Sequence, residues 1–488
     1  RKLAMESNLV KIRREIYVRI ARAFFEGNLF EKIDRIPLEM RPKSFGEATR
    51  CCIYKDRTMI EYRAMAALGL SIADETDELT PLSEYAKNAL DRDLSNSHLT
   101  ILTELCSGCV KTHYHITDAC QGCVARPCTT SCAKDAISVI DGKAKIDTTK
   151  CVNCGRCMSV CPYQSIIRVP IPCEESCPVG AISKDDNGKE VIDEEKCILC
   201  GKCLTACPFG AIAERSQLIK VMQAIKENKN ITALIAPAIA GQFPGNMEQL
   251  HSALIKLGFK NVLEVALGAE KTAIEETKEF IERMEKGKQF MTSSCCPAYM
   301  LAVKKHLNKL QEYVSSTPSP MIFTGQFAKE NYPDTLTVFI GPCLAKRSEA
   351  FESDCIDFTL TFEELGALLI AKQIDVAQCE ALPWGNNAAK EARLFATTGG
   401  VANAIGSCID KDITFLPFVV NGYDKKEFKQ LSGKLINQKA GNFIEVMTCE
   451  GGCIAGPCTI AKPNIAVRSV ESFAKKGESL SLLQEAEK

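Results

Sequence analysis

Cysteine spacing constrains the fold of this chain more than any other feature. Of its 27 cysteines, 16 lie between Cys106 and Cys207. Two stretches, Cys151–Pro162 and Cys197–Pro208, share the spacing C-x2-C-x2-C-x3-C-P. This spacing supplies thiolates to [4Fe–4S] cubanes, each of which needs four of them. Structural zinc is the alternative, but zinc sites rarely close a three-cysteine run with Cys-Pro. The region is therefore predicted to hold iron–sulfur clusters.

The other cysteines of this region complete further ligand sets. A stretched motif runs from Cys120 to Cys132, and the half-motif Cys173–Pro178 lacks its first two cysteines. In paired clusters the fourth cysteine of each motif ligates the other cluster. Exchanging fourth ligands gives four sets: Cys120, Cys123, Cys128 and Cys161; Cys132, Cys151, Cys154 and Cys157; Cys177, Cys197, Cys200 and Cys203; and Cys106, Cys109, Cys173 and Cys207. The last set requires Cys106 and Cys109 to supply the missing pair; otherwise these two are ordinary buried thiols.

Composition excludes several classes of protein. The 488 residues carry a net charge of −1, which argues against a nucleic-acid binder held by overall charge. No apolar run approaches the roughly 20 residues of a membrane span. The first residues lack the apolar block of a signal peptide. We expect a cytoplasmic protein that contacts neither membrane nor nucleic acid, in which so many thiols serve metal rather than disulfides.

Hydrophobic patterns divide the chain into three parts. Residues 1–100 show helical spacing, from Leu9 to Phe24 with a stop at Gly27-Asn28, and are expected to form a docking or capping unit. Residues 101–215 are predicted to form tandem ferredoxin-like α+β domains. Residues 216–488 alternate short β-rich runs with amphipathic stretches, which indicates an α/β domain. The predicted strands are 231–235, 262–265, 289–291, 336–340 and 443–447, and a helix is predicted over 272–285. The fold class is thus a multidomain α/β chain.

Three loops of the last part carry cysteines directly after a predicted strand. They are Thr292–Tyr299, Gly341–Glu349 and Glu445–Cys458. Because loops beyond the carboxyl ends of strands build sites in α/β folds, we expect these three to form one site.

Together with the preceding cysteine region, these three motifs resemble the [FeFe] hydrogenases over roughly residues 105–465. The resemblance implies an H-cluster, a cubane bridged to a di-iron unit that carries CO, cyanide and a dithiolate. Cys296, Cys343, Cys449 and Cys453 match the cubane ligands, and Cys453 matches the bridge. Lys346 matches a lysine that hydrogen-bonds a cyanide, and Pro237 and Met447 match residues that line the di-iron pocket.

The same resemblance implies a reaction and a proton route. Cys295 matches the thiol that relays protons to the dithiolate amine. Glu276, Glu279 and Arg283 are spaced to share one helical face, and together with Ser315 they match the family's proton path; the plain alternative is a solvated charged face. The implied reaction is 2H⁺ + 2e⁻ ⇌ H₂, the reaction of an anaerobic ferredoxin hydrogenase. The implied cofactors are the H-cluster and about four further [4Fe–4S] clusters.

Several positions depart from the usual motifs. Gly341 stands where Met precedes the cysteine in typical members, Tyr299 stands in place of Trp, and Ala238 in place of Ser. These changes leave the ligand positions intact and resemble those of a divergent, group B-like subclass. A small ferredoxin-like carrier is expected as electron donor, because no flavin or nicotinamide motif is present, and dedicated maturation proteins are implied as partners.

Three other functions remain open at this point. The hydrogenase-like iron–sulfur assembly factors share the fold and cubane cysteines but lack the di-iron unit; Lys346, Cys295 and the Glu276/Glu279/Arg283 spacing argue against them. A hydrogen sensor would keep the site and turn over slowly. A pure electron carrier would leave roughly half of the chain, beyond the cysteine motifs, without a purpose.

Overall fold

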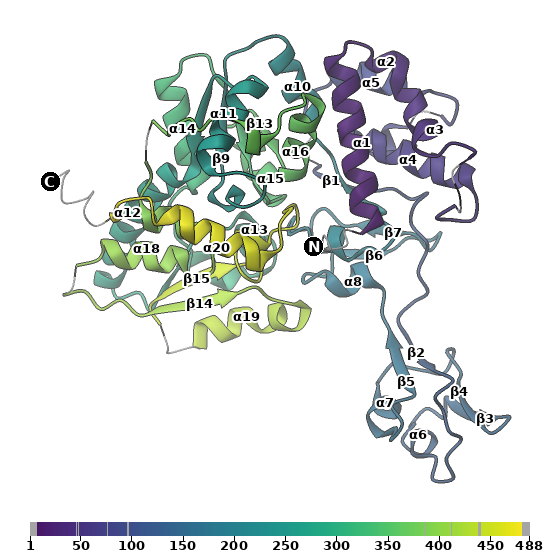
Figure 1. Ribbon diagram of the computed structural model, residues 1–488. Coiled ribbons are helices and arrows are strands. Elements are labelled where there is room, and N and C mark those ends of the chain that lie inside the picture. The colour runs from purple at the N-terminus through teal and green to yellow at the C-terminus, as the bar shows by residue number, and fades with distance from the viewer. Residues whose placement is uncertain are drawn as a thin grey trace.

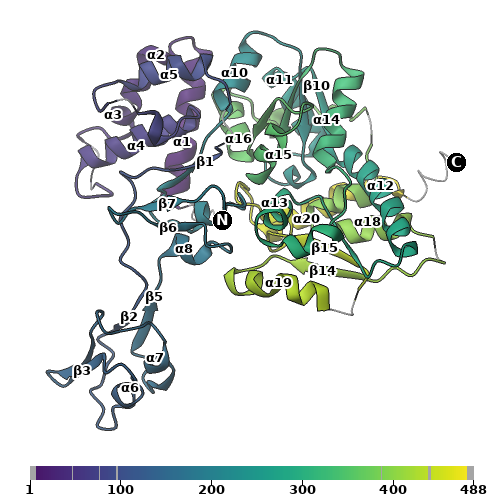
Figure 2. The ribbon, with the colours of Figure 1, turned by 180° about the vertical axis from the view of Figure 1, so that it is seen from behind.

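The computed structural model describes residues 7–480 apart from 45, 47, 76, 95–96, 386, 411 and 438–440. The chain forms a large α/β body, a group of N-terminal helices packed beside it, and a small iron–sulfur-type lobe that stands away from both (Figure 1). The reverse view also shows the lobe apart from the body and from the N-terminal helices (Figure 2). The fold class predicted from the sequence is confirmed.

Two parallel sheets form the centre of the body. One has the order β10-β9-β12-β13, and the other has the order β11-β15-β14. All of their pairings are parallel. Their strands are β9 (Ile231–Ile235), β10 (Asn261–Glu264), β11 (Met291–Thr292), β12 (Leu336–Ile340), β13 (Phe358–Leu360), β14 (Pro417–Asn421) and β15 (Phe443–Met447). Parallel strands end at the same edge, so the loops after β11, β12 and β15 are free to meet there.

The five strands predicted in this part are present, two of them shifted. Strands β9 and β15 are buried at every position, which explains their continuous apolar runs. Strands β13 and β14 were not predicted. β13 has only three residues, and β14 begins with a proline at the edge of its sheet, where no ladder hydrogen bond is needed from its nitrogen.

Helices cover both sheets. The predicted helix over 272–285 is the second half of α12 (Val265–Glu285), which packs against α14 (Pro320–Asn331) and α18 (Gly400–Cys408). The other helices of the body are α10 (Leu218–Lys226), α11 (Met247–Leu257), α13 (Pro297–His306), α15 (Ala345–Phe351), α16 (Phe362–Ala371), α17 (Lys390–Arg393), α19 (Lys425–Asn437) and α20 (Pro463–Ala474).

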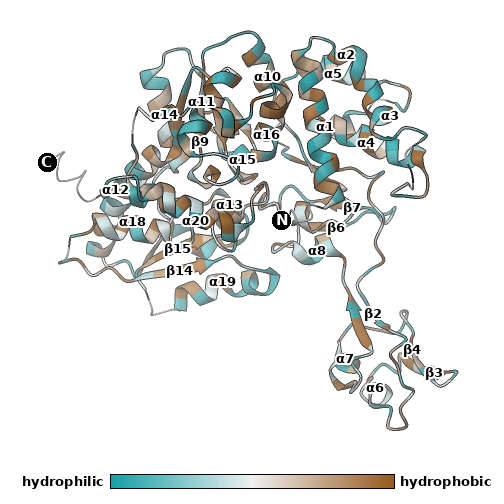
Figure 3. Ribbon diagram, in the orientation of Figure 1, coloured by the Kyte–Doolittle hydropathy of each residue, from teal (hydrophilic) through white to brown (hydrophobic). Residues whose placement is uncertain are grey.

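The N-terminal residues are helical, as predicted. The helices are α1 (Asn8–Phe25), α2 (Leu29–Lys32), α3 (Ile36–Met40), α4 (Ile53–Ala67) and α5 (Leu82–Asp91). α1 carries both hydrophobic and hydrophilic residues along its length (Figure 3). Its apolar face, including Ile16, Ile20 and Phe24, is buried, and the helix packs against α16 of the body.

A buried ionic network fixes this contact. The Arg347 guanidinium of α15 donates to both carboxylate oxygens of Glu364, at 3.0 and 2.8 Å, and lies 3.8 Å from Glu214. Tyr17 of α1 donates its hydroxyl to Glu214 at 3.0 Å. Glu214 is the last residue of β8 (Ile212–Glu214), so three parts of the chain meet at this cluster.

The cysteine-rich region forms two units. The inner unit lies against the body and contains β1 (Leu99–Ile101), α8 (Pro172–Ser176), β6 (Ile182–Lys184), β7 (Glu190–Ile192), α9 (Lys202–Ala206) and β8. The lobe contains β2 (His113–Ile116), α6 (Pro127–Thr130), β3 (Ile137–Ile140), β4 (Lys143–Ile146), α7 (Arg156–Val160) and β5 (Ile166–Val169). Antiparallel pairing of β2 with β5 forms the stalk between them.

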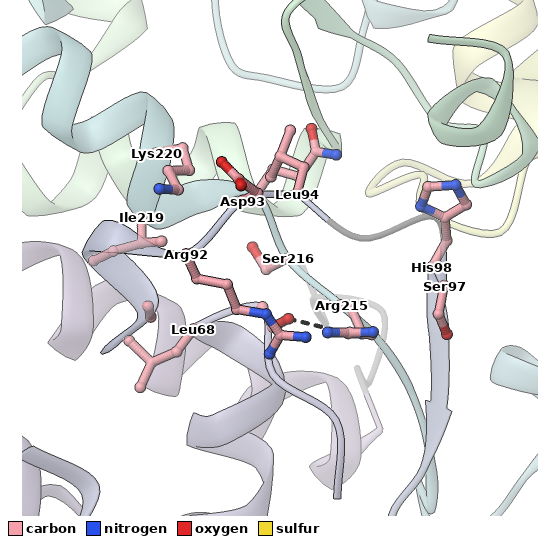
Figure 4. Close-up of a pocket in the computed structure, with 13 residues that line it drawn as sticks. Leu68, Arg92, Asp93, Leu94, Ser97, His98, Arg215, Ser216, Ile219 and Lys220 are labelled. Atoms are coloured by element: carbon pink, nitrogen blue, oxygen red, sulfur yellow. Dashed lines mark hydrogen bonds between the residues drawn. The ribbon is translucent and has the colours of Figure 1, made fainter. Parts of the chain in front are cut away.

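A small cavity marks the seam between the N-terminal helices and the body. Arg92, Asp93 and Lys220 line it, with Arg215 and Ser216 from the segment after β8 (Figure 4). Its volume of about 30 Å³ is enough for an ordered water. Arg215 donates to the Gly69 carbonyl at 3.0 Å and pairs with Asp74 at 3.4 Å. These contacts anchor the helices a second time.

Candidate functional site

The three cysteine loops of the body converge on one apolar cavity. Its volume is about 100 Å³. Cys295 and Cys296 reach it from the start of α13, Cys343 from the loop after β12, and Cys449 and Cys453 from the loop after β15. The lining also includes the predicted pocket residues Pro237, Lys346 and Met447. The structure therefore brings together all of the residues expected around the metal site.

The thiols of this cavity form one electrostatic group. Cys296, Cys343 and Cys453 each influence the pKa of Cys449, and burial raises that pKa well above its usual range. Burial also raises the pKa of Cys343 to about 11 and that of Cys453 to about 12. Without a bound metal, burial therefore keeps the thiols of Cys343, Cys449 and Cys453 protonated. Iron binds the deprotonated form, the thiolate. Four thiols facing one dry cavity are the donor set that a cubane requires.

The spacing of the thiols differs from that of a single-ion site. In the described part of the chain, no three His, Cys, Asp or Glu side chains are gathered closely enough to hold one metal ion. A single zinc ion draws its ligands to within about 2.3 Å. A cubane instead spreads four thiolates around four irons, so its ligands stand further apart.

Lys346 points its charge into this cavity from the first turn of α15. Its ammonium donates to Ser319 Oγ at 2.7 Å and to Glu349 Oε2 at 2.6 Å. Burial alone would lower the pKa of Lys346, but the Glu349 carboxylate raises it instead. The side chain therefore stays a cation with two of its three donors used. The third donor is available to an acceptor in the cavity.

Glu276 is the buried acid behind Cys295. Its side chain is fully buried, its Oε1 accepts from the Ser294 amide at 3.1 Å, and its Oε2 has no hydrogen-bond partner. Burial raises its pKa to about 8. Burial and then the Glu276 charge raise the pKa of Cys295 well above its usual range. An acid with a free oxygen and a pKa near neutrality can hold or release a proton beside this thiol.

Glu279 lies one turn further along α12, at the centre of a hydrogen-bonded group. It accepts from Ser315 Oγ at 2.6 Å, from Ser316 and Thr317, and from Arg283 at 2.7 Å. Burial would raise the pKa of Glu279, but the serine hydrogen bonds and the Arg283 charge lower it. The four residues predicted for the proton path thus form one group. It runs from the partly exposed Arg283 through Glu279 and Ser315 to the buried Glu276 beside Cys295.

In the lobe, one of the two sets expected from the cysteine spacing gathers at a single cavity. This cavity, of about 180 Å³, is lined by Cys132, Cys151, Cys154 and Cys157. Of the other set, Cys123 and Cys161 lie near enough to Cys128 for their charges to add to burial in raising its pKa.

In the inner unit, the remaining thiols also lie in two groups. After burial, the charges of Cys177 and Cys197 raise the pKa values of Cys200 and Cys203. In the same way, the charges of Cys106 and Cys207 raise the pKa of Cys109, and the charge of Cys207 raises that of Cys173. Cys200 also lines the apolar cavity of the body. The set containing Cys200 is therefore next to the candidate catalytic site.

Some residues of the site were not predicted from the sequence. Ser319 and Glu349 hold Lys346, and the spacing of three residues between Lys346 and Glu349 in a helix was the available signal. Thr448 lies 3.5 Å from the Cys296 sulfur and 3.0 Å from the Tyr423 hydroxyl. Only the fold brings Tyr423 to this point.

Apart from Cys295, the cluster motifs leave six cysteines without a set, and such thiols are expected to be mostly small buried side chains. Four of the six follow this expectation: Cys379 and Cys458 are buried, and Cys355 and Cys408 are partly buried. Cys51 and Cys52, which directly precede α4, are exposed. All 27 cysteines are free of disulfide bonds.

Comparisons with known proteins agree with this site. Residues 229–457 match the model of the iron-only hydrogenase large subunit, C-terminal domain. Residues 143–166 match a 4Fe–4S binding domain, and residues 167–218 match the LdpA Fe–S cluster-binding domain. The chain is therefore an [FeFe] hydrogenase-like protein, in which iron–sulfur binding domains precede the hydrogenase H-cluster domain.

Individual relatives include hydrogenases and proteins of another kind. Iron hydrogenase 1 of Clostridium pasteurianum is 28% identical over 411 residues, 72% of this chain and 70% of its own. The periplasmic [Fe] hydrogenase large subunit of Nitratidesulfovibrio vulgaris is 29% identical and matches 64% of this chain and 85% of its own. A probable cytosolic Fe–S cluster assembly factor of Drosophila melanogaster is 26% identical over 54% of this chain and 71% of its own. A solved [FeFe]-hydrogenase from Chlamydomonas reinhardtii, 21% identical, covers 52% of this chain and 87% of its own with a TM-score of 0.42.

Across the described residues, no helix combines the length and the apolar character needed to cross a bilayer.

Proposed function

We propose that this chain is an [FeFe] hydrogenase that catalyses 2H⁺ + 2e⁻ ⇌ H₂. One observation carries the proposal: a single apolar cavity is lined by six thiols and a buried lysine, and a buried acid lies behind Cys295, the one thiol that no cluster needs as a ligand. Metal ligation alone would require neither Lys346 nor Glu276 at these positions. A site that must also move protons requires both kinds of group.

The H-cluster would be held by the thiolates of Cys296, Cys343, Cys449 and Cys453. When bound, the H-cluster supplies the redox and hydrogen-binding chemistry, which no amino-acid side chain provides. Lys346 would give its free donor to an anionic ligand of the cluster. Pro237 and Met447 contribute apolar walls that exclude water.

The proposed proton route uses side chains of this chain and one bridging water. The Cys295 thiol gives or takes a proton at Sγ, and Glu276 exchanges that proton through its unpartnered Oε2 with one bridging water. Ser315 passes the proton on to Glu279, where Arg283 stabilises the charged carboxylate. This route accounts for the position of each group on α12 and on the loop after β11.

Four accessory clusters would supply electron transfer. They would be held by the two cysteine sets of the lobe, by Cys106, Cys109, Cys173 and Cys207, and by the set containing Cys200, which lines the cavity itself. The lobe and its stalk, residues 111–170, carry eight Lys and Arg but only four acidic residues, all Asp. A small acidic ferredoxin-like carrier therefore fits as the donor. Maturation proteins would supply the di-iron unit.

Infrared spectroscopy tests this function. Protein matured with its partners should show the bands of CO and cyanide ligands and should evolve hydrogen from reduced viologen. Matured protein without these bands would exclude hydrogenase activity. Bands with very slow turnover would indicate a hydrogen sensor instead.

The second candidate is an iron–sulfur assembly factor. It is favoured by the similarity to the Drosophila relatives, which are named as assembly factors. This function would need the cubane thiols but neither the di-iron unit nor a proton route. Transfer of a cluster to an acceptor apoprotein, by a protein that lacks the infrared bands, would establish it.

A further inference from the structure

Two arginines of the N-terminal helical region reach the inner cysteine motifs. Arg63 of α4 donates to the Phe209 carbonyl at 2.9 Å, two residues beyond Cys207. The Arg50 guanidinium lies 4.9 Å from the centre of the Phe209 ring and donates to Ser107 Oγ at 3.5 Å. Ser107 directly follows Cys106. Both cations therefore lie against the segments that carry the set Cys106, Cys109, Cys173 and Cys207.

The charge of Arg63 is poorly balanced by the protein. In the described part of the chain, no carboxylate forms an ion pair with Arg63, although most arginines of this interior do have such a partner. Burial lowers the pKa of Arg63 to about 10, and the charge of Cys207 acts against this effect. Arg63 is half-buried, and beside Cys207 only Asp56 among the described residues offsets its charge electrostatically. A guanidinium that has lost part of its hydration without gaining a counter-ion is destabilised. An anionic cluster on these cysteines would supply the missing negative charge.

Two lysines of the inner unit also lie near this set. Lys189 donates to the Cys106 carbonyl at 2.6 Å, and Lys184 lies within electrostatic reach of Cys106 and Cys109. The carboxylates nearby are Glu190, which pairs with Lys184 at 2.9 Å, and Glu174. Arg63 and Arg50 thus add positive charge beyond what the hairpin β6–β7 provides.

We propose that the N-terminal helices hold Arg63, with Arg50 beside it, against this fourth cluster and thereby raise its reduction potential. The inference rests on the proposed function, because it requires that cluster to exist. Its reduction is a one-electron step in which a reduced cluster of the lobe gives up one electron and this cluster gains one. The added negative charge is stabilised by a nearby half-buried cation, so the reduced state is favoured. The helices then make this cluster an electron acceptor for the lobe.

A redox titration followed by electron paramagnetic resonance tests the proposal in the full-length protein. The signal of this cluster is identified as the one missing from Cys106→Ser/Cys109→Ser. In Arg63→Gln, its ratio of reduced to oxidised cluster at a fixed potential should fall about tenfold, which is 59 mV for one electron. Arg63→Lys should fall less, because it keeps the charge. Arg57→Gln is the matched control, because Arg57 lies on the same helix and also donates to one backbone carbonyl, that of Arg41.

The outcomes separate the two proposals. If the cluster is present in Arg63→Gln and its potential equals that of Arg57→Gln, the charge of Arg63 does not tune it and the inference is wrong. If Arg63→Gln loses the cluster, its potential is measured in Arg63→Met instead. An unshifted potential of the cluster in Arg63→Met would also overturn the inference. If Cys106→Ser/Cys109→Ser contains as much iron as the wild type, the fourth cluster itself does not exist. A shift confined to this one signal supports the inference.

Discussion

At the scale of single residues, the proton route depends on two neighbouring cysteines having different tasks. Both line the cavity; we propose Cys296 as a cubane ligand, whereas Cys295 lies within electrostatic reach of the buried acid Glu276. Cys295→Ala should therefore leave the metal site assembled and lower hydrogen evolution by about 10²- to 10⁴-fold, the usual effect of losing one proton-transfer group. Infrared bands and viologen-driven turnover measure both effects.

Glu279→Gln should resemble Cys295→Ala, because it keeps the size of the side chain but removes the titrating group. The two changes together should be little worse than Cys295→Ala alone, since one break already blocks the route. Near-wild-type turnover in either single variant, with intact infrared bands, would mean that protons reach the site elsewhere. Glu276, Glu279 and Arg283 would then be a structural helix face.

The raised pKa of Glu276 predicts a pH dependence of stability. With a pKa of about 8 in the fold and 4.5 unfolded, the native state binds more protons between these values. The stabilising contribution is therefore complete below pH 4.5 and is lost as the pH rises towards 8, by about 1.4 kcal/mol per pH unit. Urea unfolding of the metal-free protein should show this slope in the wild type and not in Glu276→Gln.

Glu279→Gln provides a control with the opposite sign. The pKa of Glu279 is lowered in the fold. Its contribution is present above pH 4.5 and is lost as the pH falls through the lowered value. Between pH 5 and 8, Glu279→Gln should therefore keep the wild-type slope, and a parallel slope in Glu276→Gln would show that the raised pKa of Glu276 does not govern stability.

Among structural elements, the buried pair Arg347–Glu364 links α15 and α16, and through Glu214 it reaches β8 and α1. Both side chains are almost completely buried. Arg347→Met would leave two carboxylates without their cation and should lower the free energy of unfolding by about 3–5 kcal/mol. Denaturant unfolding measures this change, and limited proteolysis reports whether the N-terminal helices come loose.

Two further variants sharpen this prediction. Arg347→Met/Glu364→Gln should recover part of the loss, because one buried charge is removed with its partner. Lys278→Met breaks an exposed pair with Glu275 and should cost under about 1 kcal/mol. Equal losses in Arg347→Met and Lys278→Met would contradict a special role for the buried network.

The same element scale shows how far the sequence predicts this molecule. Ferredoxin spacing and apolar runs predicted the thiol groups, most strands of the body and α12, because these signals are local. The docking of α1 was not predictable in detail, since Tyr17 meets Glu214 across 197 positions. For the same reason Tyr423, held beside Cys296 only by the fold, was missed, whereas Glu349 follows Lys346 closely enough to have been found.

At the scale of the whole molecule, the lobe is the part best separated from the rest. It has its own small core around Tyr114, Cys157 and Ile166. The two chain segments that lead into it lie side by side, because the Ile171 amide donates to Thr112 Oγ1 at 3.4 Å. A short glycine-rich linker can therefore replace residues 113–169 without pulling the inner unit apart.

This replacement predicts a split between two electron donors. The shortened protein should lose about eight irons, those of two cubanes, while its infrared bands and viologen-driven hydrogen evolution remain. A small dye can reach the inner clusters directly, whereas a protein carrier needs the exposed surface of the lobe, where Val124 is 98% and Val152 61% exposed. The kcat/KM with an acidic ferredoxin should therefore fall at least about tenfold, and in the full-length protein it should weaken with added salt. An unchanged ferredoxin rate in the shortened protein would show that electrons enter through the inner unit, beside the cluster that Arg63 faces.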